Sequence, residues 1–234
     1  KMFNQPKVMR KVFDKIHSSL GGNIDLFIAG GAAINPDVIR DYEALGIPMI
    51  QGYGMTENAP IIAVNKDYYS KADSVGMPLP GTEVKIIDQD EEGVGEIIVK
   101  GPSVMVGYYD DPEATAEVLK DGWLYTGDYG RFDDEGFLYL CGRKKFVIVT
   151  KNGKNIFPEE IEALLMEEPF IEEVLVYGTV DKSDGDVIVR AEVFPNYDAL
   201  KEQLGEITED GIKDAIKACI ENVNDKMPTY KRVK

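Results

Sequence analysis

The feature that most constrains the fold is a strand, helix, strand succession near the N-terminus. An apolar run at residues 24–29 leads into two consecutive glycines, and a second apolar run occupies residues 47–50. Between them, Asn35 is a good N-cap and Pro36 suits the first position of a helix. This order predicts a parallel α/β layer, in which ligands bind beyond the carboxyl ends of the strands.

Before this layer, the sequence predicts one helix over residues 8–20. Its apolar side chains recur at helical spacing, at Val8, Val12, Phe13, Ile16 and Leu20. The single histidine of the chain, His17, falls in the same stretch. Catalysis by histidine also needs a positioned partner, so a structural role is expected for His17.

From about residue 73 the pattern changes to short strands separated by turns. Strands at residues 83–87 and 95–99, with a Glu-Glu-Gly turn before the second, predict a small antiparallel barrel or sheet. A helix with Asp111 as its cap and Pro112 at its first position interrupts this sheet.

A new α+β unit is predicted to follow. It begins with a hairpin around Asn152 and Gly153, a dipeptide typical of tight turns. Helices are predicted over residues 158–167 and 208–224, with strands near 173–178 and 187–194. The fold class is therefore α/β with α+β. Its predicted parts are the end of a large parallel α/β subdomain at residues 1–72, a small β-barrel-like subdomain at 73–142 and a small C-terminal α+β domain at 143–234.

Composition excludes several classes of function. The formal net charge of −16 argues against binding of nucleic acid, which needs clustered Lys and Arg against phosphates. No apolar run approaches the roughly 20 residues that span a bilayer, and the first residues lack the pattern of a signal peptide. The two cysteines are far apart and suggest neither a zinc site nor a redox pair. A cytoplasmic protein is expected.

Residues 51–57, with the sequence Gln-Gly-Tyr-Gly-Met-Thr-Glu, follow the second apolar strand. Tyr53 lies between two glycines, so backbone and an aromatic ring could face the two sides of a planar ligand such as adenine. Thr56 offers a hydroxyl for a phosphate oxygen, and the Glu57 carboxylate suits a magnesium ion. A turn with a buried tyrosine explains the same residues without a ligand.

Two further residues have ligand chemistry. Asp128 follows a glycine, and its carboxylate could accept two hydrogen bonds from a ribose diol. An Asx-turn would explain Asp128 equally well. Arg143, at the start of the third predicted part, could contact ribose or phosphate through its guanidinium group, or could be an ordinary surface residue.

In their order and spacing these motifs resemble the adenylate-forming superfamily, which includes acyl-CoA ligases, luciferases and nonribosomal adenylation domains. The resemblance covers almost the whole chain and rests on six segments, which are residues 30–32, 53–57, 95–97, 125–128, 142–145 and 152–162. Residues 51–60 and 152–156 look most like bacterial long-chain fatty-acid CoA ligases.

The resemblance implies roles for the matching residues. Thr56 would contact the α-phosphate as a catalytic residue, Glu57 would be the catalytic carboxylate that holds the metal, and Lys145 would be the hinge of a mobile C-terminal domain. The residues expected to bind ATP or coenzyme A are Gly31, Ala32, Ala33, Gln51, Gly52, Tyr53, Gly54, Met55, Thr56, Asp128, Arg143 and Gly153. Tyr53 belongs to the adenine side, Asp128 and Arg143 to the ribose, and Gly153 to the pantetheine arm of coenzyme A.

The implied activity is ATP- and Mg²⁺-dependent formation of an acyl-adenylate from a fatty acid, followed by acyl transfer to coenzyme A as co-substrate. Peripheral membrane contact of the complete protein stays open. In the family, a phosphate-binding loop would precede Lys1 and a catalytic lysine would follow Lys234, so the 234 residues alone are expected to be inactive. The alternatives are an adenylation domain that loads a carrier protein and a non-catalytic nucleotide-binding module.

Overall fold

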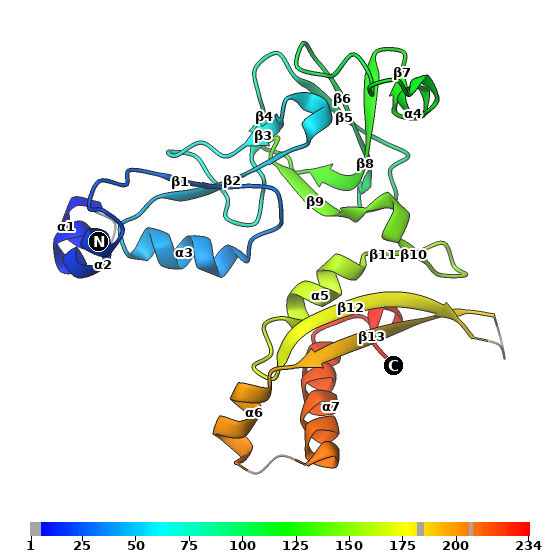
Figure 1. Cartoon of the computed structure of the whole chain (residues 1–234). Coiled ribbons are helices and arrows are strands. Elements are labelled where there is room, and N and C mark those ends of the chain that lie inside the picture. The colour runs from blue at the N-terminus through cyan, green and yellow to red at the C-terminus, as the bar shows by residue number, and fades with distance from the viewer. Residues whose placement is uncertain (1–5, 182–184, 206–207) are drawn as a thin grey trace. The chain divides into compact units, whose positions relative to one another are not determined.

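The chain divides after Leu140 into two units, residues 1–140 and 141–234. The computed structural model describes residues 6–181, 185–205 and 208–234, so the first five residues of the predicted 1–72 part lie outside the described residues. Figure 1 shows the elements of both units. The predicted boundary between residues 72 and 73 stays a prediction.

The first unit begins with a four-stranded sheet in the order β1-β2-β3-β4. Its β1 and β2 are parallel, and α3 connects them, as the strand, helix, strand pattern predicts. The side chain of Asn35 caps α3 by accepting a hydrogen bond from the backbone N–H of Asp37. The other pairs are antiparallel. The elements are α1 (Pro6–Val12), α2 (Asp14–Ser19), β1 (Phe27–Ala29), α3 (Pro36–Ala44), β2 (Met49–Gly54), η1 (Thr56–Asn58), β3 (Ile61–Val64) and β4 (Met77–Pro78).

The single helix predicted over residues 8–20 is wrong, because Phe13 has non-helical backbone angles that separate α1 from α2. Its apolar positions are largely exposed, with Val12 at 65% and Ile16 at 38%. His17 is buried, and its Nε2 makes a 2.9 Å hydrogen bond with the carbonyl oxygen of Leu45.

A five-stranded sheet forms the rest of the first unit. Its order is β5-β6-β8-β7, and β9 also pairs with β8. This sheet is the predicted antiparallel β-subdomain, and the Asp111 side chain caps its helix, as expected. The elements are β5 (Glu83–Ile87), β6 (Gly95–Lys100), α4 (Pro112–Val118), β7 (Leu119–Lys120), β8 (Trp123–Phe132) and β9 (Leu138–Arg143).

One apolar cluster joins the two sheets of the first unit. Ile62 of β3, Ile97 of β6 and Leu138 of β9 are all completely buried in it. Full burial of each such side chain is worth about 2 kcal/mol. Tyr53, at the end of β2, belongs to the same cluster.

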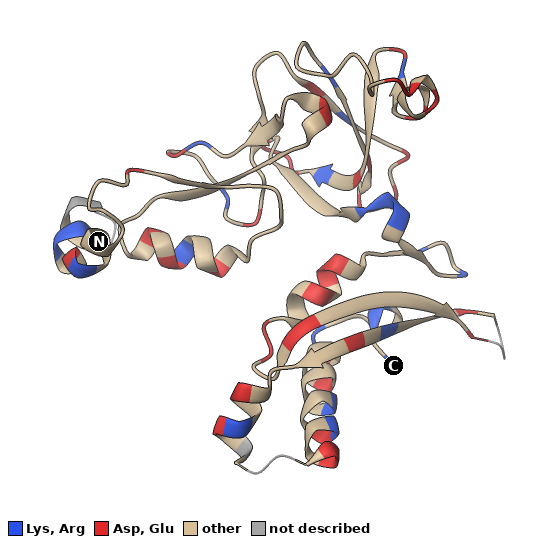
Figure 2. Ribbon diagram, in the orientation of Figure 1, with Lys and Arg blue, Asp and Glu red and all other residues tan. Residues whose placement is uncertain are grey.

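In the second unit, α5 and α7 pack against the hairpin of β12 and β13. Thr208 caps α7, and side chains spaced by four residues, Cys219 and Val223, are buried against the hairpin. Figure 2 shows Lys and Arg at η2 and acidic residues along α5. The elements are η2 (Lys144–Phe146), β10 (Ile148–Val149), β11 (Asn155–Ile156), α5 (Pro158–Leu165), β12 (Ile171–Val180), β13 (Val187–Pro195), α6 (Tyr197–Leu204), α7 (Glu209–Asp225) and η3 (Thr229–Lys231).

Candidate nucleotide site

The loops after β1 and β2 lie at the same edge of the first sheet. Because these strands are parallel, with Ala29 opposite Gln51, their carboxyl ends point the same way. A Cβ atom on Gly30 would lie 3.6 Å from the carbonyl oxygen of Gly52. Residues 31–33 are exposed beside this edge. The structure thus brings the predicted Gly31, Ala32 and Ala33 close to the strand that carries Tyr53.

Tyr53 and Asp128 meet, although they are 75 positions apart in the sequence. The Tyr53 hydroxyl donates a 2.6 Å hydrogen bond to Oδ2 of Asp128. Both residues are only 8% exposed. A carboxylate can accept about four hydrogen bonds on its two oxygens, so its chemistry allows it to accept from a ribose diol as well as from Tyr53.

A bulge in β8 sets the position of Asp128. Opposite β6, the register moves from Ile98 against Tyr125 to Glu96 against Tyr129, so β8 has extra residues at this point. Gly127 has a φ of +70°, which a glycine adopts without strain. Asp128 therefore lies within β8, directly after the glycine of the bulge.

The Thr126 side chain stabilises the bulge through two hydrogen bonds. Its hydroxyl donates to the carbonyl oxygen of Ile97 at 2.8 Å and accepts from the backbone N–H of Asp128 at 3.1 Å. Both hydrogen bonds are buried. Thr126 thus links the backbone N–H of Asp128 to the neighbouring strand β6.

Gly54 allows a sharp reversal between β2 and β3. A Cβ atom at this position would lie 2.0 Å from the carbonyl oxygen of Pro60, so only glycine fits. The backbone N–H of Met55 donates to the same oxygen at 2.8 Å. The reversal leaves Thr56 exposed and Glu57 half-buried at the turn. The close approach that Gly54 permits is thus to the protein's own backbone.

The Asn58 side chain holds this turn in place from the protein interior. It is completely buried, donates to the carbonyl oxygen of Ile61 at 2.9 Å and accepts from the Ser103 hydroxyl at 3.2 Å. Sequence reasoning gave Asn58 and Ser103 no role. The sequence around Asn58 and Ser103 does not indicate this contact, because the two residues are 45 positions apart.

Glu57 has a partner that sequence reasoning also missed. The Tyr108 hydroxyl donates to its Oε1 at 2.9 Å, and the backbone N–H of Met105 donates to its carbonyl oxygen at 2.8 Å. The hydrogen bond to Glu57, with a smaller effect of burial, raises the pKa of Tyr108. Tyr108 therefore stays protonated at neutral pH and holds the carboxylate in one orientation.

The donor set fits a magnesium ion that is held mainly by phosphates and water. Within the described residues, no group of three or more His, Cys, Asp or Glu side chains converges on one point. Mg²⁺ is commonly bound through one or two carboxylates together with substrate phosphates. Glu57 can supply such a carboxylate.

The Gln51 side chain is buried and hydrogen-bonded inside the protein. Its amide Nε2 donates to the carbonyl oxygen of Ala72 at 2.7 Å, and the residue is only 6% exposed. This contact ties β2 to the segment that follows β3. Its side chain therefore supports the strand, whereas the sequence suggested direct contact with a ligand.

The other three candidates belong to the second unit. The exposed Arg143 ends β9, and its backbone N–H donates to Oε1 of Glu159 at 3.1 Å. Lys145 lies in η2 with its Nζ 4.7 Å from the centre of the Phe146 ring. Gly153 occupies the turn between β10 and β11, where its N–H donates to Thr150.

Two family models match the chain. The model described as AMP-binding enzyme matches residues 1–109. The model described as AMP-binding enzyme C-terminal domain matches residues 145–234. The first match lies within the first unit and the second within the second unit.

Curated relatives are CoA ligases. A long-chain-fatty-acid–CoA ligase of Escherichia coli O6:H1 is 38% identical over 196 residues, which are 80% of this chain and 33% of the relative. An indoleacetate–CoA ligase of Aromatoleum aromaticum is 45% identical over 170 residues, which are 69% of this chain and 33% of the relative. The chain spans about a third of the length of these relatives.

Solved structures confirm the predicted fold class. The o-succinylbenzoate CoA synthetase of Bacillus subtilis, in complex with its acyl-adenylate intermediate, matches with a TM-score of 0.72 and 29% identity, over 93% of this chain and 44% of that one. The same enzyme with ATP and a magnesium ion matches with a TM-score of 0.71 and 28% identity, over 94% and 45% of the two chains. In the part of the chain that the structure describes, no helix has the length and apolar character to cross a membrane.

Proposed function

Because the chain belongs to the AMP-binding enzyme family, we propose that the complete protein is an AMP-forming acyl-CoA ligase and that the first unit holds the adenosine of its ATP. The hydrogen bond between Tyr53 and Asp128 carries the nucleotide assignment. It unites an aromatic ring suited to adenine and a carboxylate suited to ribose in one place.

The proposed reaction has two steps. A carboxylate oxygen of the acid attacks the α-phosphorus of ATP, the bond to the β-phosphate breaks, and pyrophosphate leaves with the electron pair. The sulfur of coenzyme A then attacks the acyl carbonyl carbon, loses its proton, and displaces AMP. Both steps depend chiefly on positioning and on stabilisation of charge.

Each residue then has a defined task. Tyr53 supports the adenine, Asp128 accepts from the ribose hydroxyls, and the exposed Thr56 hydroxyl donates to an α-phosphate oxygen. Glu57 would hold Mg²⁺, which neutralises phosphate charge when it is bound with ATP. Tyr108 keeps the Glu57 carboxylate oriented.

The second unit has the remaining roles. Arg143 adds a cation to the ribose side, Lys145 is the hinge, and the Gly153 turn faces the pantetheine arm. Turns closed by glycine allow close backbone approach to a ligand. For the compartment we propose the cytoplasm, where ATP and coenzyme A are both present.

For the acid, we propose a long-chain fatty acid. The support is the 38% identity to the Escherichia coli long-chain ligase and 40% identity to the Bacillus subtilis one. An arylacetic acid is the second candidate, favoured by the 45% identity to the indoleacetate ligase.

ATP–pyrophosphate exchange by the full-length protein tests the proposal. Carboxylic acids from acetate to palmitate, with indoleacetate alongside, would be compared, and AMP release would be measured with and without coenzyme A. Long-chain acids should give the highest kcat/KM, and steady AMP release should require coenzyme A. Exchange stimulated only by indoleacetate would favour the second candidate, and no exchange with any acid would refute the ligase assignment.

The role of Asp128 is tested by Asp128→Ala in the same assay. Loss of ribose positioning should lower the exchange rate about a hundredfold. Asp41→Ala removes an exposed carboxylate from α3 and serves as the matched control, with wild-type exchange expected. Equal activity of Asp128→Ala and the control would remove Asp128 from the site.

A further inference from the structure

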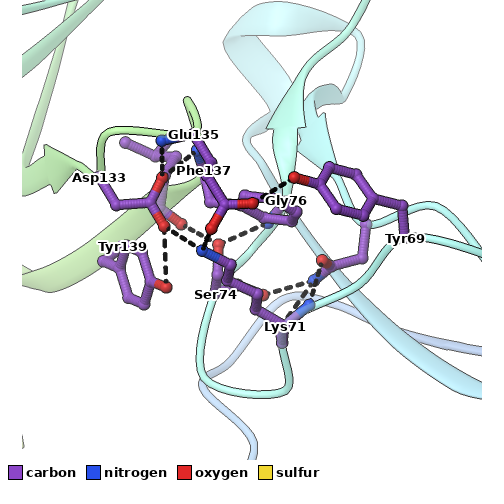
Figure 3. A network of polar contacts seen from close by, with 10 residues as sticks. Tyr69, Lys71, Ser74, Gly76, Asp133, Glu135, Phe137 and Tyr139 are labelled. Atoms are coloured by element: carbon purple, nitrogen blue, oxygen red, sulfur yellow. Dashed lines mark hydrogen bonds and ion pairs between the residues drawn. The ribbon is translucent and has the colours of Figure 1, made fainter.

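Lys71 makes two ion pairs across the first unit. Its Nζ lies 2.6 Å from Oδ2 of Asp133 and 2.8 Å from Oε1 of Glu135, and both carboxylates belong to the turn between β8 and β9 (Figure 3). The same ammonium lies 4.6 Å from the centre of the Phe137 ring. Lys71 itself belongs to the segment between β3 and β4, so it bridges the two sheets.

The acceptors of Lys71 are held in place by further hydrogen bonds. Oδ1 of Asp133 accepts from the backbone N–H groups of Glu135 and Phe137, at 3.0 and 2.9 Å. The Tyr139 hydroxyl donates to Oδ2 of Asp133 at 3.2 Å, and the Tyr69 hydroxyl donates to Glu135. Figure 3 shows the two carboxylates meeting at the Lys71 ammonium, with Tyr69 and Tyr139 hydrogen-bonded to them.

The ionisation of the cluster agrees with its geometry. The hydrogen bond from Lys71 is the main reason why the pKa of Asp133 falls to about 2. The same contact is the main cause of the raised pKa of Lys71, and Lys71 also lowers the pKa of Glu135. All three groups are charged at neutral pH.

The backbone of Lys71 is tied to β2 through Asn65, which is only 3% exposed. The Asn65 side chain accepts from the N–H of Lys71 at 3.0 Å and donates to the carbonyl oxygen of Ser74 at 2.5 Å. The N–H of Asn65 donates to the carbonyl oxygen of Gln51 at 3.1 Å. The side-chain amide of Gln51 donates to the carbonyl oxygen of Ala72, next to Lys71, at 2.7 Å.

These contacts form a closed path through the first unit that includes Tyr53 and Asp128. One side runs from Tyr53 to Gln51 along β2 and on to Lys71. The other runs from Lys71 to Asp133, which directly follows β8, and back along β8 to Asp128. The hydrogen bond between Tyr53 and Asp128 completes the path.

We infer that Lys71 is a positioning residue for nucleotide binding, which fixes β8 against β2 so that Tyr53 and Asp128 stay aligned for adenosine. The inference rests on the proposed function of those two residues. Lys71 touches neither the Tyr53 ring nor the Asp128 carboxylate in the described contacts, and it acts through the two strands.

Calorimetric binding of AMP to the full-length protein tests the inference. Lys71→Met keeps the length of the side chain and removes its charge, and it should weaken AMP binding about fivefold to tenfold. KM for ATP should rise similarly, while KM for coenzyme A stays the same. Lys71→Arg keeps both ion pairs within reach and should restore most of the affinity. If Lys71→Met does not fold, Asp133→Asn takes its place with the same expectation.

The matched control is Lys231→Met. Lys231 makes a 2.6 Å ion pair with Glu160 and its side chain is 16% exposed, but it lies in the second unit. AMP affinity should remain within about twofold of the wild type. An equal loss of affinity in Lys71→Met and Lys231→Met would mean a general loss of stability and would overturn the inference.

A double-mutant cycle separates positioning from an independent effect. If Lys71 acts through the Tyr53–Asp128 pair, Tyr53→Phe combined with Lys71→Met should lose less affinity than the product of the two single losses. Multiplicative losses would overturn the inference. A normal AMP affinity of Asp128→Ala would instead refute the proposed nucleotide site itself.

Discussion

Replacement of Gly54 by alanine should disrupt the turn that presents Thr56 and Glu57. The new Cβ atom would lie 2.0 Å from the carbonyl oxygen of Pro60 and 2.9 Å from Cα of Ile61. Ordinary contact begins at 3.4 Å, so the two backbone segments must separate by about 1.4 Å. Neither neighbour is a flexible side chain that could rotate away.

The cost of Gly54→Ala has two parts. Overpacking against backbone costs about 1–3 kcal/mol. The separation also breaks the 2.8 Å hydrogen bond between the N–H of Met55 and the carbonyl oxygen of Pro60, which is worth about 1 kcal/mol. A loss of about 3 kcal/mol in the free energy of unfolding is expected, which corresponds to a fall of about 10 °C in Tm.

Gly52→Ala is the internal comparison. Its Cβ atom would lie 3.1 Å from the carbonyl oxygen of Ala63 and 3.2 Å from a methyl group of Val64, so shifts of a few tenths of an ångström relieve the contact. A cost of about 1 kcal/mol is expected. Urea denaturation compares the stability of Gly52→Ala with that of Gly54→Ala, and calorimetry compares their affinities for AMP.

Two results would refute this reasoning. The first is a Gly54→Ala protein that is no less stable than Gly52→Ala, because the steric argument requires a clear difference. The second is a Gly54→Ala protein that is destabilised as expected but binds AMP normally. That outcome would mean that the turn at Gly54 does not contribute to AMP binding.

Three further predictions concern both units. Tyr53→Phe should lower the free energy of unfolding by about 2 kcal/mol in urea denaturation, because it removes a buried hydrogen bond to the charged Asp128 carboxylate; a change below about 0.5 kcal/mol would contradict this. Asp133, whose pKa is lowered to about 2, stabilises the fold fully above about pH 4, and this contribution should disappear as the pH falls toward 2. Urea denaturation midpoints measured at successively lower pH should fall less in Lys71→Met than in the wild type. An equal fall in both proteins would contradict Lys71 as the cause of the lowered pKa of Asp133. Leu165→Ala, at a completely buried position of the second unit, should cost about 3 kcal/mol by thermal denaturation, and a loss below about 1 kcal/mol would contradict close packing there.

Local chemistry explains which elements could be predicted from the sequence. The cap at Asn35 and the cap at Asp111 each involve a side chain and a backbone group within three residues. The turn at Gly153 is equally local. Parallel pairing of β1 and β2 follows from the helix between them, because such a crossover leaves few alternatives.

Elements that depend on distant partners could not be predicted. The helix over residues 8–20 was predicted from apolar spacing, but Phe13 interrupts it, and His17 is buried with a hydrogen bond to Leu45, 28 positions away. The bulge at Gly127 exists only relative to β6, so the sequence of β8 alone does not contain its register. Tyr108 was missed for the same reason, since Glu57 is 51 residues away.

The candidate site needs directional contacts in addition to its apolar core. Ile62, Ile97 and Leu138 hold the two sheets together, but apolar burial is non-directional and tolerates small sliding of one sheet over the other. A hydrogen bond of 2.6 Å between Tyr53 and Asp128 does not tolerate such sliding. Directional contacts between the segments attached to these strands can supply this alignment, and the ion pairs and hydrogen bonds of Lys71 are contacts of this kind.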